Sequence, residues 1–205
     1  MTGRSPARRR FLVAAAALLA LGCAPQPAAQ KAPPAAAAVA MPDRYSAEVA
    51  SSILADGGNA VDAAIAAAFV LAVTSPECGN IGGGGFMLAR VGDEATFLDF
   101  REVAPAAATR DMYLDAHGKV VEGASLTGHR AVRVPGTVAG LWAAHQKYGT
   151  KPWADLLSTA IMLAEMGFKV PPQLEQVMHV EMPRLKGTAN FAKYFGGLHA
   201  GGMVR

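Results

Sequence analysis

The chain has 205 residues, a formal net charge of +3 and only two cysteines, Cys23 and Cys78. Two cysteines provide neither a disulfide framework nor the ligand spacing of a metal site. Four arginines lie in residues 1–22, which contain no acid, so removing them changes the net charge from +3 to −1. The composition therefore excludes a basic nucleic-acid-binding surface, and we expect neither a metal nor a cofactor.

Residues 1–22 have the features of an export signal and are excluded from the folded part. Three arginines, Arg8–Arg10, precede an apolar run, Phe11–Leu21, that is shorter than the roughly 20 residues of a membrane-spanning helix. The arginines and the Phe-Leu pair after them resemble a twin-arginine signal, and Cys23 lies where a bacterial lipoprotein is cleaved. We expect an exported protein, periplasmic or anchored by a lipid on Cys23. The alternative is an ordinary secretory signal whose cysteine is incidental.

Alanine, proline and glutamine dominate residues 23–41, which predicts a disordered tether before a folded domain over 42–205. Apolar residues at helical spacing predict a first helix that ends at Asp56-Gly-Gly58. Asn59 is expected to cap a second helix over 60–74. Nearly every residue of this second helix is apolar, so we place it at the centre of the domain, buried on all sides.

A glycine run, Gly82–Gly85, follows the second helix and precedes two predicted strands, 86–91 and 95–100, joined by a turn at Gly92-Asp93. The run lacks the spacing of a dinucleotide fingerprint and the Gly-Lys-Ser/Thr of a P-loop. Glycines here allow another backbone or a ligand to approach closely. Arg101 follows the second strand and is a candidate for binding an anionic ligand. The alternative is a structural ion pair of Arg101 with Asp99 or Glu102.

Further helices are expected over 109–114, from Pro135-Gly136 to Gly149, from Pro152 to Gly167, and over 171–182. The second and third of these are predicted to form an antiparallel pair that packs on the sheet. Their predicted core-facing residues are Val138, Leu141, Trp142 and Tyr148 on one helix, and Trp153, Leu156, Leu157, Ala160, Ile161 and Ala164 on the other.

Other reactive side chains lack a catalytic context. Cys78 has no base near it in the sequence and is interpreted as a small packed residue. The surroundings of Ser125 miss a nucleophile elbow, because Thr127 stands where the last glycine is required. His117 is interpreted as a solvated turn residue and His145 as a solvated or core-edge residue.

Five blocks, in order, resemble the gamma-glutamyltranspeptidase (glutathione hydrolase) family over most of residues 45–170. They are GGNAVDAA at 57–64, IGGGGFM at 81–87, DFREVAP at 99–105, ATRDMYLD at 108–115 and PGTVAGL at 135–141. The resemblance implies that Arg101 binds the α-carboxylate of a γ-glutamyl substrate. A planar guanidinium matches a carboxylate with two donors, which a lysine does not reproduce.

The resemblance also implies an α+β fold of the N-terminal-nucleophile hydrolase type, a four-layer αββα sandwich of which this chain has only the N-terminal part. The family's precursor cleaves itself and exposes an N-terminal threonine, whose free amine can serve as its base. We expect that threonine beyond residue 205, in a small subunit that forms a heterodimer with the large one. Residues 1–205 thus hold no catalytic nucleophile and are expected to be inactive alone.

The implied reaction cleaves the γ-glutamyl amide of glutathione and transfers the γ-glutamyl group to water or an amino acid. Two alternatives stay open from the sequence. One is a related cephalosporin or glutaryl acylase, and the other is a non-catalytic exported domain that binds acidic solutes through Arg101.

Overall fold

The computed structural model describes residues 37–185, 187, 191, 193 and 202–204. The export signal, Cys23 and most of the tether lie outside these residues. Residues 38–205 group into one compact unit. Its elements are α2 (Arg44–Ala55), α3 (Ala60–Thr74), β1 (Phe86–Val91), β2 (Glu94–Asp99), η2 (His129–Ala131), α4 (Thr137–Tyr148), α5 (Trp153–Met166), β3 (Phe168–Lys169), α6 (Pro172–Leu185) and β4 (Met203–Val204). Within the described residues, no helix combines the length and apolarity needed to cross a membrane.

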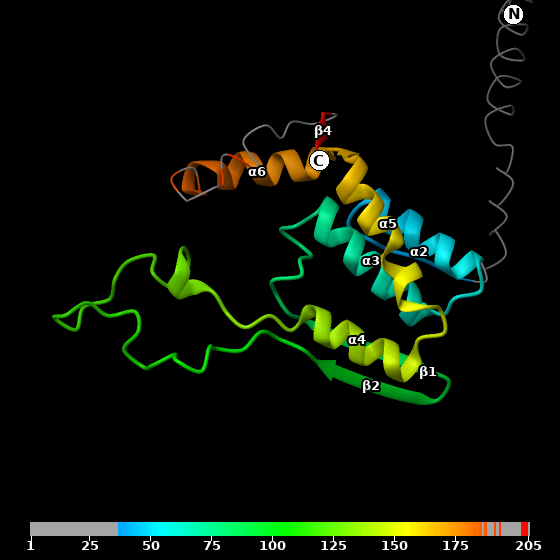
Figure 1. Cartoon of the computed structure of the whole chain (residues 1–205), viewed down its shortest axis with the longest axis horizontal. Coiled ribbons are helices and arrows are strands. Elements are labelled where there is room, and N and C mark those ends of the chain that lie inside the picture. Colours follow the sequence, from blue (N-terminus) through cyan, green and yellow to red (C-terminus); the bar gives the residue numbers. More distant parts are fainter. Residues whose placement is uncertain (1–36, 186, 188–190, 192, 194–201, 205) are drawn as a thin grey trace, which may run out of the picture. The chain divides into compact units, whose positions relative to one another are not determined.

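Helix α3 is the centre of the hydrophobic core, as the sequence predicts. It packs against α2, α4 and α5 (Figure 1). Ile65, Ala66 and Val70 on this helix are fully buried. The prediction holds for most of its circumference, although Ala64 is exposed. Small side chains allow the three neighbouring helices to approach α3 closely.

The N-terminus of α3 is fixed by a buried carboxylate. The Asn59 side chain accepts hydrogen bonds from the amides of Val61 and Asp62, and Asp62 accepts one in return from the Asn59 amide, which completes a capping box. Asp62 is fully buried and also accepts from the amide of Thr150, at 3.0 Å, and from its hydroxyl. One carboxylate therefore ties the α4–α5 connection to the start of α3.

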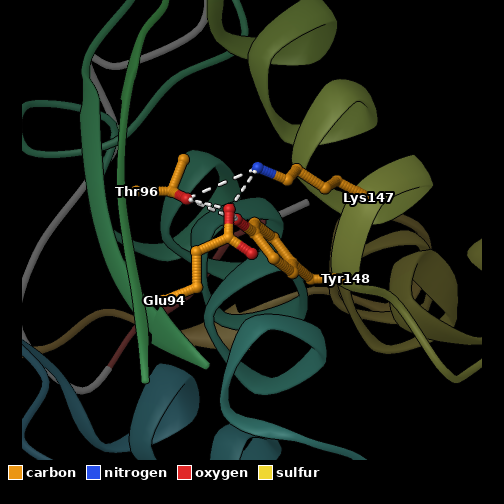
Figure 2. A network of polar contacts seen from close by, with 4 residues as sticks. All are labelled: Glu94, Thr96, Lys147 and Tyr148. Atoms are coloured by element: carbon orange, nitrogen blue, oxygen red, sulfur yellow. Dashed lines mark hydrogen bonds and ion pairs between the residues drawn. The ribbon is translucent and has the colours of Figure 1, made fainter. Parts of the chain in front are cut away.

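Strands β1 and β2 form the predicted hairpin, with Phe86 opposite Asp99 and Val91 opposite Glu94. Gly92 has φ +60° at the tight turn, a conformation that glycine adopts without strain. One face of the hairpin meets helix α4. There Lys147 donates to Glu94 at 2.8 Å, and the hydroxyls of Tyr148 and Thr96 hydrogen-bond each other (Figure 2). The Lys147 ammonium holds the pKa of Glu94 below its usual range.

The predicted helix over 109–114 is wrong. This segment consists of turns within the long irregular connection from β2 to α4, and Leu114 forms a β-bridge with Val120. Thr109, Arg110 and Asp111 are exposed and the apolar residues, Met112–Leu114, are consecutive, so a helix here would not gather them into a stripe of helical spacing. The turn that follows is as predicted: the Asp115 side chain accepts the amides of residues 117 and 119.

Helices α4 and α5 have the predicted bounds, but their buried faces differ from the prediction. On α4 the buried residues are Gly140, Leu141 and Ala144, while Val138 and Trp142 are both 44% exposed. On α5 they are Leu156, Ala160 and Leu163, while Ile161 and Ala164 are exposed. Both helices contact α3, and α4 also contacts β2. Because the core is centred on the helix α3, it buries a narrower stripe of α4 and of α5 than a flat sheet would bury.

Candidate functional site

The candidate site lies where three backbone segments meet at the end of β2. Gly85 and Phe100 exchange backbone hydrogen bonds at 3.4 and 3.0 Å, which extends the hairpin ladder beyond β1 and β2. Val103 and Val134 exchange a second pair, at 3.2 and 2.9 Å. The segment that carries Arg101 is therefore held on both sides by backbone pairing.

The glycine run is joined to the start of α4 by one carbonyl group. The amides of Gly136 and Thr137 both donate to the carbonyl oxygen of Gly83, at 2.8 and 3.1 Å. These amides belong to the first turn of α4, whose N–H groups have no partner within the helix. The glycine run thus caps α4 and fixes it relative to the segment carrying Arg101.

Close packing explains why glycine is required at positions 84 and 140. A Cβ on Gly84 would lie 2.3 Å from the amide nitrogen of Glu102. A Cβ on Gly140 would lie 2.0 Å from the ring of Phe100, which packs across α4 at that point. The sequence predicted a close approach to the glycine run by a backbone or a ligand. The structure shows the backbone of residues 100–102 there.

Arg101 extends from this platform toward solvent, and its side chain is 57% exposed. Its Nε lies 3.4 Å from Oε2 of Glu102, and its guanidinium carbon lies 5.9 Å from the centre of the Phe86 ring. Asp99 contacts the Arg101 backbone, because its Oδ1 accepts the amide at 3.0 Å. Of the two acids that could pair with this guanidinium, Glu102 does so and Asp99 does not. Among the described residues, neither Nη atom of Arg101 donates a hydrogen bond.

Glu102 also holds a second arginine that the sequence analysis did not identify. Nη1 of Arg133 lies 3.3 Å from Oε1 of Glu102, whose side chain is only 16% exposed. The pKa of Glu102 is lowered, chiefly by its own backbone amide and then by the charges of Arg101 and Arg133. Arg133 comes two residues before the PGTVAGL block, but only the Val103–Val134 bridge brings it to Glu102.

The other candidate side chains lie outside this site. Cys78 is exposed, so its interpretation as a packed residue is wrong. It lies in a turn closed on the carbonyl of Ser75, and the neighbouring Gly79 packs on α3 instead. His117 is exposed, as predicted. His145 is a core-edge residue stacked on Trp142, with Nε2 at 2.7 Å from the Lys151 carbonyl. The described residues contain no cluster of acids, histidines and cysteines suited to a metal ion.

Comparison with known proteins identifies a family whose members are similar to this chain. The profile of the gamma-glutamyltranspeptidase family matches residues 46–203. The glutathione hydrolase proenzyme of Pseudomonas aeruginosa is 54% identical over 164 residues, covering 80% of this chain and 29% of that protein. The Escherichia coli glutathione hydrolase proenzyme is 47% identical over 174 residues, covering 77% and 30%. The chain thus spans less than a third of the length of these relatives.

Solved structures agree with the sequence relatives. Gamma-glutamyltranspeptidase from Pseudomonas nitroreducens, complexed with L-DON, superposes with a TM-score of 0.80 at 53% identity, covering 82% of this chain and 50% of that one. The cephalosporin acylase of Bacillus halodurans superposes less well, with a TM-score of 0.67 at 27% identity, covering 78% and 31%. The expected fold, the N-terminal part of an N-terminal-nucleophile hydrolase, is therefore confirmed as helices with a small β-hairpin.

Proposed function

The chain belongs to the gamma-glutamyltranspeptidase family, and on this premise we propose that it contributes the substrate-carboxylate site of a glutathione hydrolase. In this proposal Arg101 binds the α-carboxylate of a γ-glutamyl substrate. The complete enzyme cleaves the γ-glutamyl amide and transfers the γ-glutamyl group to water or to an amino acid. The acylase alternative has less support, because the acylase structure is 27% identical to this chain against 53% for the transpeptidase.

The geometry of Arg101 is the observation that carries the proposal. Glu102 contacts the guanidinium at Nε, so the edge formed by the two Nη atoms remains available to a carboxylate. That edge can donate two parallel hydrogen bonds, which fix the orientation of the ligand as well as its position. The paired backbone on both sides of residues 100–103 restrains the base of the side chain.

The proposed chemistry needs a nucleophile that residues 1–205 do not supply. We assign this role to an N-terminal threonine exposed by self-cleavage, in the C-terminal part that the longer relatives have. Its amine accepts the hydroxyl proton as the oxygen attacks the γ-carbonyl. The C–N bond of the γ-amide then breaks, and the leaving amine takes the proton from the threonine amine. The γ-glutamyl ester that remains on the threonine is resolved by water or by an acceptor amine. The two parts would form a heterodimer, as the name proenzyme indicates for the relatives.

The test is steady-state kinetics of the complete enzyme with a γ-glutamyl anilide, beside its melting temperature. A hydrogen bond to a charged group contributes about 1.5–3 kcal/mol, so Arg101→Ala should lower kcat/KM by roughly 10- to 150-fold. Arg101→Lys keeps the charge and loses the paired donors, so it should remain clearly defective. A lowered melting temperature with unchanged kinetics would remove Arg101 from the substrate site.

A further inference from the structure

One carboxylate is shared by two arginines at the candidate site. Glu102 presents Oε2 to Arg101 and Oε1 to Arg133, at 3.4 and 3.3 Å. Its side chain is mostly buried, whereas the side chains of Arg101 and Arg133 are 57% and 54% exposed. Both guanidiniums therefore keep donors toward solvent while one anion lies between them.

Glu102 creates an electrostatic problem for a site that binds a carboxylate through Arg101. A fixed anion beside Arg101 repels a second one, and it competes for the same guanidinium donors. With Glu102 and Arg101 alone, the local charge would sum to zero. Arg133 restores a net positive charge to the group of three, and it occupies the Glu102 oxygen that Arg101 does not contact.

We propose that Arg133 is a positioning residue for the substrate carboxylate. By binding Oε1 of Glu102, it keeps that carboxylate on the Nε side of Arg101 and leaves the two Nη donors of Arg101 for the substrate. Arg133 itself touches neither the substrate nor the reacting atoms. This inference rests on the proposed binding role of Arg101.

A purely structural role explains Arg133 less well. The Val103–Val134 bridge already pairs the two backbone segments through two hydrogen bonds. The Arg133 side chain is half exposed, and an ion pair with an exposed partner adds little stability to such a pairing. The effect of Arg133 on the charge near the ligand does not depend on how much the ion pair stabilises the fold. Substrate affinity and the melting temperature can therefore be measured as separate effects.

The test is a double-mutant cycle in the complete enzyme, with Arg133→Gln, Glu102→Gln and the double variant, assayed on a γ-glutamyl anilide. Arg133→Gln should raise KM by up to about fivefold, the upper end of the range for one exposed charge pair, with kcat and the melting temperature little changed. In the Glu102→Gln background the same substitution should raise KM much less, because no anion remains to be restrained. Arg133→Lys should restore most of the loss.

Arg110→Gln is the matched control. It removes one positive charge from the same connection, and Arg110 is paired with Asp111 and not with Glu102. Its KM should equal that of the parent enzyme. Equal KM effects of Arg133→Gln with and without Glu102, or an effect equal to that of the control, would overturn the inference. If the Arg101 variants also retain normal kinetics, the proposed function fails as well.

Discussion

Adding one methyl group to Gly84 should disturb Arg101 without touching it. The new Cβ would lie 2.3 Å from the amide nitrogen of Glu102 and 2.6 Å from the carbonyl oxygen of Phe100. Both neighbours are backbone atoms of the segment that carries Arg101. Oε2 of Glu102 would also lie 2.6 Å away, but rotating that side chain alone would leave the backbone clash in place. Ordinary contact begins at 3.4 Å, so the glycine run and the Arg101 segment must move apart by about 1 Å. A displacement of this size can lower the rate of an enzyme by about 100-fold.

Two neighbouring glycines provide a graded control for the same substitution. A Cβ on Gly82 would be 3.6 Å from the Asn80 side chain, which is ordinary contact, and a Cβ on Gly85 would be 3.1 Å from the edge of the Phe100 ring. None of these glycines has a positive φ, so alanine suits the backbone at each position. We expect kcat/KM on a γ-glutamyl anilide to fall in the order Gly82→Ala, Gly85→Ala, Gly84→Ala.

The melting temperature separates misplacement of Arg101 from loss of the fold. Overpacking typically destabilises by about 1–3 kcal/mol, so part of the Gly84→Ala protein should remain folded and measurable. That folded fraction should show a raised KM. Equal kinetics for Gly84→Ala and Gly82→Ala would refute the argument that the close backbone contact positions Arg101.

Two other predictions concern the fold and the leader. Burial raises the pKa of Asp62, but hydrogen bonds from Thr150 and from the amide of Asn59 outweigh it, and the pKa is lowered. The ionised Asp62 therefore stabilises the folded state at pH values above the ordinary Asp pKa, and this stabilisation is lost as the pH falls. Asp62→Asn should therefore destabilise by about 2–3 kcal/mol near neutral pH and flatten the acid dependence of the melting temperature, unlike Asp93→Asn at the exposed turn. For export, mass spectrometry should find the leader removed before or near Cys23, with the new N-terminus diacylated if Cys23 is a lipoprotein cysteine; a cytoplasmic product retaining the leader would contradict this.

The features that the sequence predicted correctly are those encoded locally. The cap at Asn59, the stop at Gly149 and the turn at Gly92 each depend on a few consecutive residues whose conformational preferences agree. The helix expected over 109–114 failed because its prediction used local propensity without an apolar stripe of helical spacing. The packed interpretation of Cys78 failed for a related reason: a turn decides which of its side chains faces the core, and composition does not.

Arg133 illustrates what the sequence could not provide. Its partner Glu102 is 31 residues away, and they meet only because a single bridge, Val103–Val134, pairs two irregular segments. No periodicity or motif predicts a pairing of that kind. Arg101 was a candidate from its position after the second strand, and the family resemblance then assigned it the binding of the substrate carboxylate.

The exposed apolar face of the β1–β2 hairpin agrees with the four-layer fold class. Ala89 and Thr96 face the helices, while Phe86, Leu88 and Phe97 on the opposite face are exposed, with the two phenylalanine rings stacked 5.6 Å apart. In a four-layer sandwich each sheet has helices on one face and a second sheet on the other. An outward face of large apolar side chains fits the second requirement, because such a face is stable only when another layer covers it. Arg101 lies at the rim of this same face, against Phe86, so the layer that covers the hairpin would also border the proposed carboxylate site.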